Sequence, residues 1–469
     1  MSVSASDGKV ASMTGINQLT PPENATDELK GRHESLNFKG KKIVLTTLGS
    51  LGDLHPYIAI GLELKERGYR VTLATTPFYR AKIEATGLNF HPMRPDLPSP
   101  EENPELAAKL IAKVMDVRKG GEFLFKELLV PHVRDGYADL REATRNADLL
   151  VTHMITYAGP ILAQKTGIPW ISTVLAPATF FSAYEPIVLP QLPSLTKLLR
   201  LSPLFSRAFF SLVRRKLDNW VEPIYKLRAE LGLPRGLHPI FEGQYSPALN
   251  LALFSKFLGA PQPDWPPQTL VTGFPFYDKK DETNISHELE QFLDAGPSPI
   301  VFTLGSSAIF VADDFYRESV AAARQLKRRA VLLIGDERNR PKEALPEGIV
   351  AFDYAPYGQI LPRAAAIVHQ GGVGTTGQAL RAGVPMLIVP FNHDQPDNAS
   401  RIARLGVGRT IPRTKYTAAN AARELDRLLS DESYTAKAAE IGRQVRDENG
   451  ASKAADAIET FTRAYPMKR

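Results

Sequence analysis

The chain has 469 residues, too many for one ordinary hydrophobic core, and its length therefore predicts two domains. Hydrophobic residues make up 43% and charged residues 23%, as is typical of a soluble globular protein, and the lack of cysteine excludes disulfides, thiolate catalysis and thiolate metal sites. The net charge of +6 is modest for this length, and no cluster of aromatic and basic residues indicates nucleic-acid binding.

The first 38 residues are rich in Ser, Asp, Asn and Pro and lack the apolar centre of a secretory signal. We therefore expect residues 1–38 to be a disordered tail. No apolar run approaches the roughly 18–20 residues that span a bilayer. Together with the lack of cysteine, this pattern favours a cytoplasmic location.

Strand and helix patterns alternate from Lys41 onward. "KIVLTTL" predicts a strand, "PYIAIGLELKERG" a helix starting near Pro56, and "YRVTLATT" a second strand, with "ADLLVTH" and "PWISTVLAP" as later strands. Such βαβ units contain parallel strands joined by right-handed crossovers. The alternation stops over residues 185–247 and resumes at "TLVTGFP", so we place the first domain at residues 39–278.

The polar stretch "YDKKDETNISHELE" suggests a linker at residues 279–290. A second series of strands follows, in "PIVFTLGSS", "RAVLLIG", "GIVAFDYAP", "AAIVHQGG" and "PMLIVPF". These predict a second domain over residues 291–440, followed by a C-terminal helix within residues 441–469. The expected fold class is α/β, with two doubly wound, Rossmann-like parallel sheets.

The tetrapeptide Thr-Leu-Gly-Ser ends the first predicted strand of each half, at Thr47–Ser50 and at Thr303–Ser306. Glycine permits a tight turn close to a ligand, and serine caps a helix or donates to an anion. Ligands of open parallel sheets bind beyond the carboxyl ends of the strands. If the two sheets face each other, both loops therefore lie on one interdomain cleft.

A glycine-rich loop follows the predicted strand "AAIVH". Glycines 371, 372, 374 and 377 leave backbone N–H groups free at the start of the helix "GQALRAG", where the helix dipole also favours an anion. His369 stands just before the loop and can donate to a phosphate oxygen. The loop is therefore predicted to hold a diphosphate without a metal ion.

The same loop matches the dinucleotide pattern G-x-G-x-x-G as Gly372-Val-Gly374-Thr-Thr-Gly377, and Asp394 follows the next strand. An NAD-dependent oxidoreductase is therefore the alternative enzyme class. The pattern usually opens its domain, whereas here it lies deep in the second half.

The segment from Val368 to Ala399 resembles the donor-binding signature "HxGGxGT…GVPxxxxPxxxDQxxNA" of the UDP-glycosyltransferase superfamily, whose members are inverting enzymes with the GT-B fold. "GSLGDLHP" resembles the acceptor-side loop of this family. "APQPDWPPQTLVTGFPFYD" and "PIVFTLGSS" are similar to the rhamnosyltransferase subunit of rhamnolipid synthesis. The resemblance covers nearly all of residues 40–465.

The resemblance implies that residues 39–278 bind the acceptor and residues 291–440 the nucleotide-sugar. His369 would contact the diphosphate, and Asp394 and Gln395 would grip the sugar hydroxyls. Tyr354 would stack on the base or serve as a buried structural residue. The residues implied in donor binding are Ser306, Tyr354, His369, Gly372, Gly374, Thr375, Thr376, Asp394 and Gln395. The last helix would cross back to the first domain.

A hydroxyl acceptor needs a general base, which relatives carry on the loop after the first strand. Asp53 occupies that position, His55 is the rival, and a purely structural role such as helix capping is a third interpretation. Relatives of the plant type pair a catalytic His with a downstream Asp. Here His153 stands near the matching strand end, so no such dyad is predicted.

Phe180, Phe181 and Tyr184 follow a predicted strand and suit the wall of an apolar acceptor pocket, although ordinary core packing explains them nearly as well. Between Leu195 and Arg235, nine Lys or Arg face three acids among Leu, Phe and Trp. This stretch is interpreted either as helices covering the cleft or as a peripheral contact with the inner membrane face.

We expect rhamnose from dTDP-rhamnose as the transferred sugar, with glucose from UDP-glucose next. The helix reads Gly377-Gln378-Ala379 where many plant relatives have a ribose-binding glutamate. Either Gln378 replaces that glutamate or the ribose contact is absent, and its absence would suit a dTDP donor. Acceptors would be hydroxy-acyl lipids, flavonoids or other phenols, sterols or macrolides. A sugar-nucleotide epimerase of the same fold and a non-catalytic sugar-nucleotide-binding protein are the further alternatives.

Overall fold

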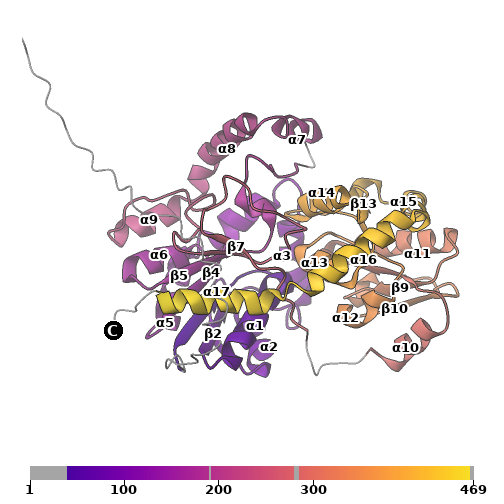
Figure 1. Ribbon diagram of the computed structural model, residues 1–469, viewed down its shortest axis with the longest axis horizontal. Coiled ribbons are helices and arrows are strands. Elements are labelled where there is room, and N and C mark those ends of the chain that lie inside the picture. The colour runs from indigo at the N-terminus through magenta and orange to yellow at the C-terminus, as the bar shows by residue number, and fades with distance from the viewer. Residues whose placement is uncertain (1–39, 190–191, 279–284, 465–469) are drawn as a thin grey trace, which may run out of the picture. The chain divides into compact units, whose positions relative to one another are not determined.

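The computed structural model describes residues 40–189, 192–278 and 285–464, and Figure 1 shows their path. The predicted tail at residues 1–38 and the first part of the predicted linker, residues 279–284, lie outside the described residues. Helix α10 (His287–Asp294) begins within the linker range and packs Leu289 and Leu293 into a hydrophobic core.

The first half contains a seven-stranded parallel sheet. Its spatial order is β3-β2-β1-β4-β5-β6-β7. The strands are β1 (Lys42–Thr46), β2 (Arg70–Thr75), β3 (Asn89–Pro92), β4 (Leu149–His153), β5 (Trp170–Val174), β6 (Asn250–Ala252) and β7 (Thr269–Val271). The strand order reverses between β1 and β4, which pair directly through Ile43–Thr46 and Leu149–Thr152.

The second half contains a six-stranded parallel sheet with the order β10-β9-β8-β11-β12-β13. Its strands are β8 (Ile300–Thr303), β9 (Ala330–Leu333), β10 (Ile349–Phe352), β11 (Ala366–His369), β12 (Met386–Ile388) and β13 (Gly408–Thr410). The order reverses between the paired strands β8 and β11. Two doubly wound Rossmann-like sheets confirm the predicted fold class.

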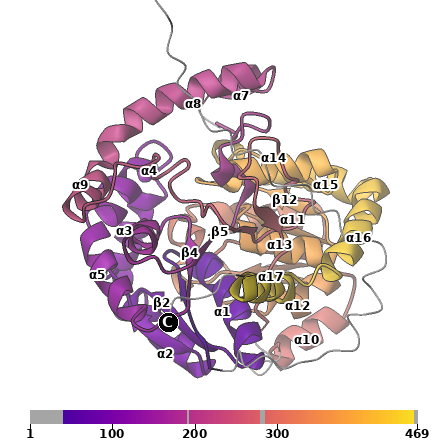
Figure 2. The ribbon, with the colours of Figure 1, turned by 60° about the vertical axis from the view of Figure 1, so that its left-hand side comes forward.

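Helices connect successive strands in both halves (Figures 1 and 2). Those of the first half are α1 (Leu51–Glu66), α2 (Arg80–Ala85), α3 (Pro104–Val114), α4 (Gly120–Phe123), α5 (Val133–Ala143), α6 (Ala158–Thr166), α7 (Pro193–Leu199), α8 (Pro203–Leu217) and α9 (Glu222–Glu230). The second half adds α11 (Phe315–Gln325), α12 (Tyr357–Ile360), α13 (Val373–Ala382), α14 (Gln395–Leu405), α15 (Ala418–Ser430), α16 (Glu432–Arg446) and α17 (Gly450–Ala464).

Helix α1 starts earlier than the sequence pattern predicted. Ser50 is its N-cap, because the Ser50 hydroxyl accepts a hydrogen bond from Gly52 N (3.3 Å) and Asp53 receives one from Ser50 N (2.8 Å). This reciprocal capping begins the helix at Leu51, and Pro56 lies inside it rather than at its start. The expectation of a helix starting near Pro56 was therefore wrong.

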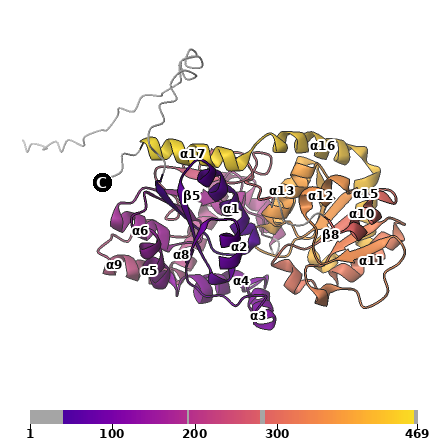
Figure 3. The same ribbon diagram turned by 90° about the horizontal axis from the view of Figure 1, so that it is seen from below.

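The two halves share packed surfaces. One hydrophobic core joins Val174 and Phe254 of the first half to Val301 and Ile367 of the second. The terminal helix α17 contacts α1, where Arg67 pairs with Asp456 and Glu459. Figure 3 shows α16 beside the second half and α17 over the first, so the end of the chain contacts both halves.

Candidate active site

The strand ends at the two reversal points carry most of the residues that the sequence singled out. Asp53 follows β1 and His153 ends β4, the two strands between which the first sheet reverses. Ser306 follows β8 and His369 ends β11, the corresponding pair in the second sheet. Ligands of doubly wound sheets bind at such reversal points.

Gly49 creates the space that Asp53 occupies. Its φ of +123° lies in the region that favours glycine, and a Cβ atom there would overlap the Asp53 carboxylate. Ser50 Oγ also donates to Asp53 Oδ2 (3.1 Å). Burial raises the pKa of Asp53 to about 6 against the opposing effect of these hydrogen bonds, yet the side chain remains 28% exposed. Asp53 is therefore a weakly acidic carboxyl that a ligand can reach.

His153 lies behind Asp53, and the sequence analysis did not predict this contact. Its Nε2 is 3.6 Å from Asp53 Oδ1. Burial lowers the pKa of His153 to about 3, so the ring is neutral at physiological pH. Neither ring nitrogen has a hydrogen-bond partner among the described residues. The pair reverses the order seen in plant-type relatives, with the carboxylate on the first loop and the imidazole at the second strand end.

The two candidate bases on α1 face different surroundings. His55 packs its ring on Tyr277, with the ring centres 5.3 Å apart. Asp53, two residues earlier and therefore about 200° around the helix, lies near Tyr79 and Asp394, whose pKa values its charge raises further. The charge of Asp53 therefore acts on Asp394 of the second half.

His369 ends β11 and opens the glycine-rich loop. Its Nδ1 accepts a hydrogen bond from Gly371 N (3.1 Å), which places the ring proton on Nε2. Nε2 is buried and has no partner among the described residues, and burial lowers the pKa of His369 to about 3. A neutral imidazole thus presents one unused N–H donor at the start of the loop.

The loop leads directly into α13, whose N-cap is Gly372. Gly371 has a φ of +88°, and a Cβ atom there would lie 2.7 Å from Ile388 Cγ2, so glycine is required. Thr375 and Thr376 lie in the first turn, and Thr376 Oγ1 is buried without a partner in the described chain. This arrangement offers several N–H donors and a hydroxyl to an anion.

The second Thr-Leu-Gly-Ser copy packs against the glycine-rich loop that follows His369. A Cβ atom on Gly305 would overlap Gln370 Nε2, so this glycine makes room for the residue that follows His369. Thr303 Oγ1 lies 3.0 Å from the hydroxyl of Tyr357. Ser306 follows Gly305 and is partly exposed. In each half the repeated glycine thus accommodates a side chain at the reversal point.

The N-termini of α1 and α13 lie close together. A Cβ atom built on Gly374 would be 3.9 Å from Gly52 Cα. Each helix start carries a partial positive charge. The first N–H groups of α13 have no intrahelical partners, whereas those of α1 are largely engaged by the Ser50 cap. The Asp53 loop of the first half and the glycine-rich loop of the second half therefore border the same junction between the halves, here called the gap.

Asp394 and Gln395 begin α14 beside this gap. Asp394 stands at the N-cap position of the helix and accepts a hydrogen bond from Asn398 Nδ2 (2.7 Å), while burial raises its pKa to about 7. Gln395 Oε1 accepts from the backbone N–H groups of Phe391 (2.9 Å) and Asn392 (3.2 Å). The Gln395 oxygen therefore holds the loop, and its amide nitrogen is left for another acceptor.

Two family descriptions match the halves of the protein. Residues 43–130 match the glycosyltransferase family 28 N-terminal domain, and residues 317–459 match the erythromycin biosynthesis protein CIII-like C-terminal domain. O-mycaminosyltylonolide 6-deoxyallosyltransferase of Streptomyces fradiae is 30% identical over 90% of this chain and 97% of its own length. The protein belongs to the UDP-glycosyltransferase superfamily. It is a glycosyltransferase, and the relatives named here are glycosyltransferases rather than oxidoreductases.

Other relatives agree with this assignment. The sterol 3-beta-glucosyltransferase of Cryptococcus neoformans is 29% identical over 90% of this chain, which spans only 27% of that protein's length. Among solved structures, the glycotransferase of kitacinnamycin superposes with a TM-score of 0.68 at 24% identity, over 90% of this chain and 100% of the other. That likeness confirms the GT-B fold.

The remaining donor-side candidates of the glycosyltransferase differ in exposure. Tyr354 is 72% exposed after β10, so its ring is open to a ligand. Gln378 Oε1 accepts from Arg381 (2.7 Å), and Arg381 is also paired with Asp278. The Gln378 oxygen is thereby engaged within the protein.

The predicted acceptor aromatics separate into buried and exposed rings. Phe180 is stacked on Trp265 with the ring centres 3.9 Å apart and lies in the core. Phe181 packs on Phe241 at 4.8 Å and is partly buried. Tyr184 is exposed and lies under the Arg207 guanidinium. Of the three, Tyr184 offers its ring most freely to a ligand.

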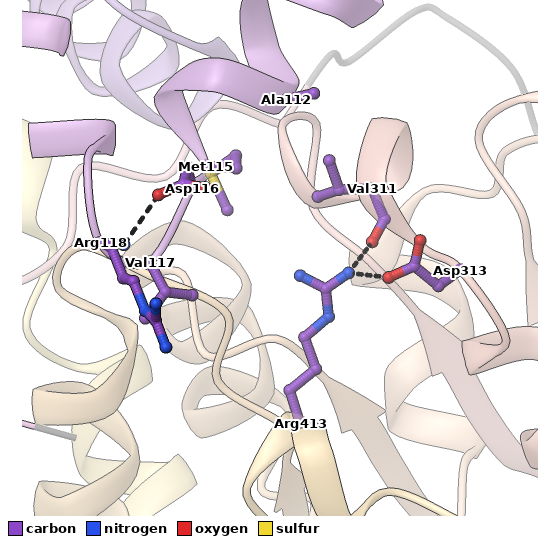
Figure 4. A pocket seen from close by; sticks show the side chains of 8 residues that line it. All are labelled: Ala112, Met115, Asp116, Val117, Arg118, Val311, Asp313 and Arg413. Atoms are coloured by element: carbon purple, nitrogen blue, oxygen red, sulfur yellow. Dashed lines mark hydrogen bonds and ion pairs between the residues drawn. The ribbon is translucent and has the colours of Figure 1, made fainter. Parts of the chain in front are cut away.

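Two segments of the first half, around Glu185 and around Met115, contact the second half. Glu185 pairs with Arg401 and Arg404 of α14, and Arg401 also pairs with Asp397. The α3 segment buries Met115 in the core of the second half, beside a pocket of about 340 Å³ that Figure 4 shows. The pocket is lined by Ala112, Met115, Asp116, Val117, Arg118, Val311, Asp313 and Arg413, and none of the donor-side candidates contributes to it.

Asn392 links the α3 segment to the loop that carries Asp394. Its Nδ2 donates to Asp116 O (3.0 Å) and Val114 O (3.5 Å). We expect Asn392→Ala to lower kcat/KM for the donor about 5- to 30-fold, because about 1–2 kcal/mol of positioning energy is lost. Steady-state kinetics with varied donor would measure the change.

Asn89→Ala is the matched control, since Asn89 Nδ2 makes one similar bond to Val71 O (2.9 Å) far from the gap. It should lower the melting temperature comparably and leave kcat/KM unchanged. Equal kinetic losses in both variants would show that Asn392 acts through stability alone.

The described residues contain no group of three or more His, Asp or Glu side chains arranged to hold a metal ion. None of the helices in this described part combines the length and apolar character needed to cross a bilayer.

Proposed function

We propose that the protein is an inverting glycosyltransferase that moves a sugar from a nucleotide diphosphate to a hydroxyl of a hydrophobic acceptor. The observation that carries this proposal is the closeness of Asp53, a reachable carboxyl with a raised pKa, to the anion-binding start of α13. A base and a leaving-group site must lie on either side of the anomeric carbon in an in-line displacement.

In the proposed mechanism Asp53 accepts the proton of the acceptor hydroxyl as the oxygen attacks the anomeric carbon. The bond from that carbon to the diphosphate oxygen breaks, and attack from the opposite face inverts the configuration. His153 acts as a positioning residue, since its neutral ring borders Oδ1 while Ser50 holds Oδ2. The Ser50 contacts fix the carboxylate before the acceptor arrives.

The leaving diphosphate would be stabilised by His369 and the first turn of α13. The unpartnered Nε2–H of His369, the unpartnered Thr376 hydroxyl and the N–H groups after Gly372 all suit phosphate oxygens. Ser306 would add a hydroxyl from the β8 end. These donors and two helix dipoles supply charge compensation, so we propose that no metal ion is required.

The donor sugar is proposed to be a hexose, with the 6-deoxy sugar rhamnose from dTDP-rhamnose favoured and glucose from UDP-glucose next. The Streptomyces fradiae relative is named for transfer of a 6-deoxy sugar, and the Cryptococcus relative for glucose. Asp394 and the free amide of Gln395 would grip the sugar hydroxyls. Tyr354 would stack on the base, and the engaged oxygen of Gln378 suits a nucleotide without a ribose 2′-hydroxyl.

The acceptor is proposed to be a large apolar molecule with one reactive hydroxyl, such as a macrolide or a sterol. The names of the two relatives support these classes, one carrying a tylonolide acceptor and the other a sterol. Tyr184 would contribute the exposed wall, with Phe181 and Phe180 supporting it from the core side. Hydroxy-acyl lipids and phenols have the same apolar character.

A nucleotide panel tests this donor assignment. We expect dTDP and UDP to raise the melting temperature by about 2–4 °C at roughly 100 times their Kd, because they bind only the folded state. NAD and NADP should cause no shift. Differential scanning fluorimetry would measure the shifts, and a shift with NAD but not with either nucleoside diphosphate would contradict the proposal.

A further inference from the structure

The helix pair α7–α8, residues 193–217, presents an apolar surface that no described element covers. Figures 1 and 2 show both helices at the edge of the molecule, outside both sheets. Leu201 is 76% exposed, Leu204 71% and Leu212 65%. Half of the large exposed apolar side chains in the described chain lie between residues 192 and 212, so this is where exposed apolar side chains concentrate.

The exposed side chains of α8 form a stripe along one side of the helix. Leu204, Ala208 and Leu212 recur every four residues, and Phe205 lies beside them. The opposite side carries the buried Ser206 and Phe210, which attach the helix to the first half. Both sides of α8 are therefore rich in apolar residues, and only one of them packs against other described residues.

The charged side chains of the same surface are all positive. Residues 193–217 contain six cations and no Asp or Glu. These cations are Lys197, Arg200, Arg207, Arg214, Arg215 and Lys216. Among the described residues only Arg214 of the six forms an ion pair, with Glu242. An anionic, apolar-cored partner matches this combination.

The helix pair also adjoins the proposed acceptor site. Arg207 lies over the ring of Tyr184 and donates to its hydroxyl (3.4 Å). Arg200 donates to Ser400 of α14 (3.1 Å). The helix pair therefore contacts both the Tyr184 wall and the middle of α14 on the donor side.

We propose that α7–α8 docks on an anionic lipid bilayer and that the hydrophobic acceptor enters from that bilayer. The exposed leucines bury in the headgroup boundary, and the cations contact lipid phosphates. The entry route rests on the proposed function, whereas the docking itself requires neither donor nor transfer.

Vesicle flotation of the full-length protein tests the docking. Vesicles of phosphatidylcholine with phosphatidylglycerol should bind the protein, and phosphatidylcholine alone should bind at least about tenfold less. Lys197→Ala/Arg215→Ala/Lys216→Ala should weaken binding to the anionic vesicles by about a hundredfold or more. Leu201→Ser/Leu204→Ser/Leu212→Ser should weaken it at least about tenfold.

The matched control is Leu106→Ser/Leu237→Ser/Leu270→Ser, which removes three exposed leucines elsewhere and should bind vesicles normally. Both leucine variants should transfer sugar to a detergent-free, water-soluble acceptor at the wild-type rate. Equal binding by all variants, or no binding to either vesicle, would overturn the proposal. A dimer in light scattering that dissociates only in the α7–α8 leucine variant would instead identify this surface as a contact between two copies, and would also overturn it.

Discussion

Replacing Asp53 by Asn is expected to lower kcat for sugar transfer about 10²- to 10⁴-fold, the usual contribution of a general base. Asparagine keeps an oxygen for the N–H of Ser50 and therefore preserves the start of α1, but it cannot accept the acceptor's proton. The Kd for the nucleoside diphosphate, measured by calorimetry, should stay within about twofold, because the phosphate donors lie in the other half.

The pH dependence of activity is a second test of Asp53 as the general base. Burial raises the pKa of Asp53 to about 6, and only the ionised carboxylate acts as a base. Activity of the wild type should therefore rise about tenfold per pH unit below 6 and level off above it, and Asp53→Asn should lack this acidic limb of the pH–rate profile.

The raised pKa of Asp53 in the folded state also means that the free energy of unfolding falls as the pH rises from about 4 to 6. The Asn variant should therefore melt at an equal or higher temperature at pH 7.

His55→Gln is the discriminating variant, since His55 is the rival base and its ring packs on Tyr277. It should retain nearly full activity. If His55→Gln lost activity and Asp53→Asn kept it, the assignment of the base would be reversed. If both kept it, neither side chain would be the base.

His369 supports the second large prediction, which concerns donor binding. His369→Asn keeps an acceptor for Gly371 N near the place of Nδ1 but lacks the outer donor at Nε2. We expect it to weaken nucleoside diphosphate binding about 10- to 150-fold, the cost of one hydrogen bond to a charged group. Calorimetric titration with dTDP and UDP would measure the loss.

His369→Gln provides the matched test, because its amide nitrogen reaches the place of Nε2 while no acceptor remains near Nδ1. It should bind the nucleotide within about fivefold of wild type. The opposite order, with Asn binding well and Gln poorly, would show that His369 orients the loop rather than contacting phosphate. Since burial lowers its pKa to about 3, His369 should add no pH dependence to binding between pH 5 and 9.

Much of the fold could be predicted from the periodicity of apolar residues in the sequence. The elements that were not predicted share physical features that hide them. The longer apolar strands were predicted because a strand buried on both faces is nearly continuous in Val, Ile and Leu. The short strands β3 (Asn89–Pro92) and β13 (Gly408–Thr410) were not, since each lies at a sheet edge and is rich in polar, Pro or Gly residues. Local composition carries little information about such pairings.

The candidate site also contains features that the sequence predicted and features that it did not. The loop after His369 was visible because its glycines and helix start have a fixed order in the sequence. The approach of His153 to Asp53 was not, because it depends on β1 and β4 being neighbours at the reversal of the sheet. Likewise, the sequence did not show that Asp53 occupies the space where a Gly49 side chain would lie, or that Gln370 does the same at Gly305. Contacts between strand ends are set by topology rather than by spacing.

The meeting of the N-termini of α1 and α13 has a consequence for catalytic turnover. We expect two like-signed dipole ends this close together to repel each other, and a bound dianion to offset that repulsion. The nucleotide then acts as an electrostatic bridge between the halves, holding them together for as long as it stays. We therefore expect release of the nucleotide to require the two helix starts to move apart.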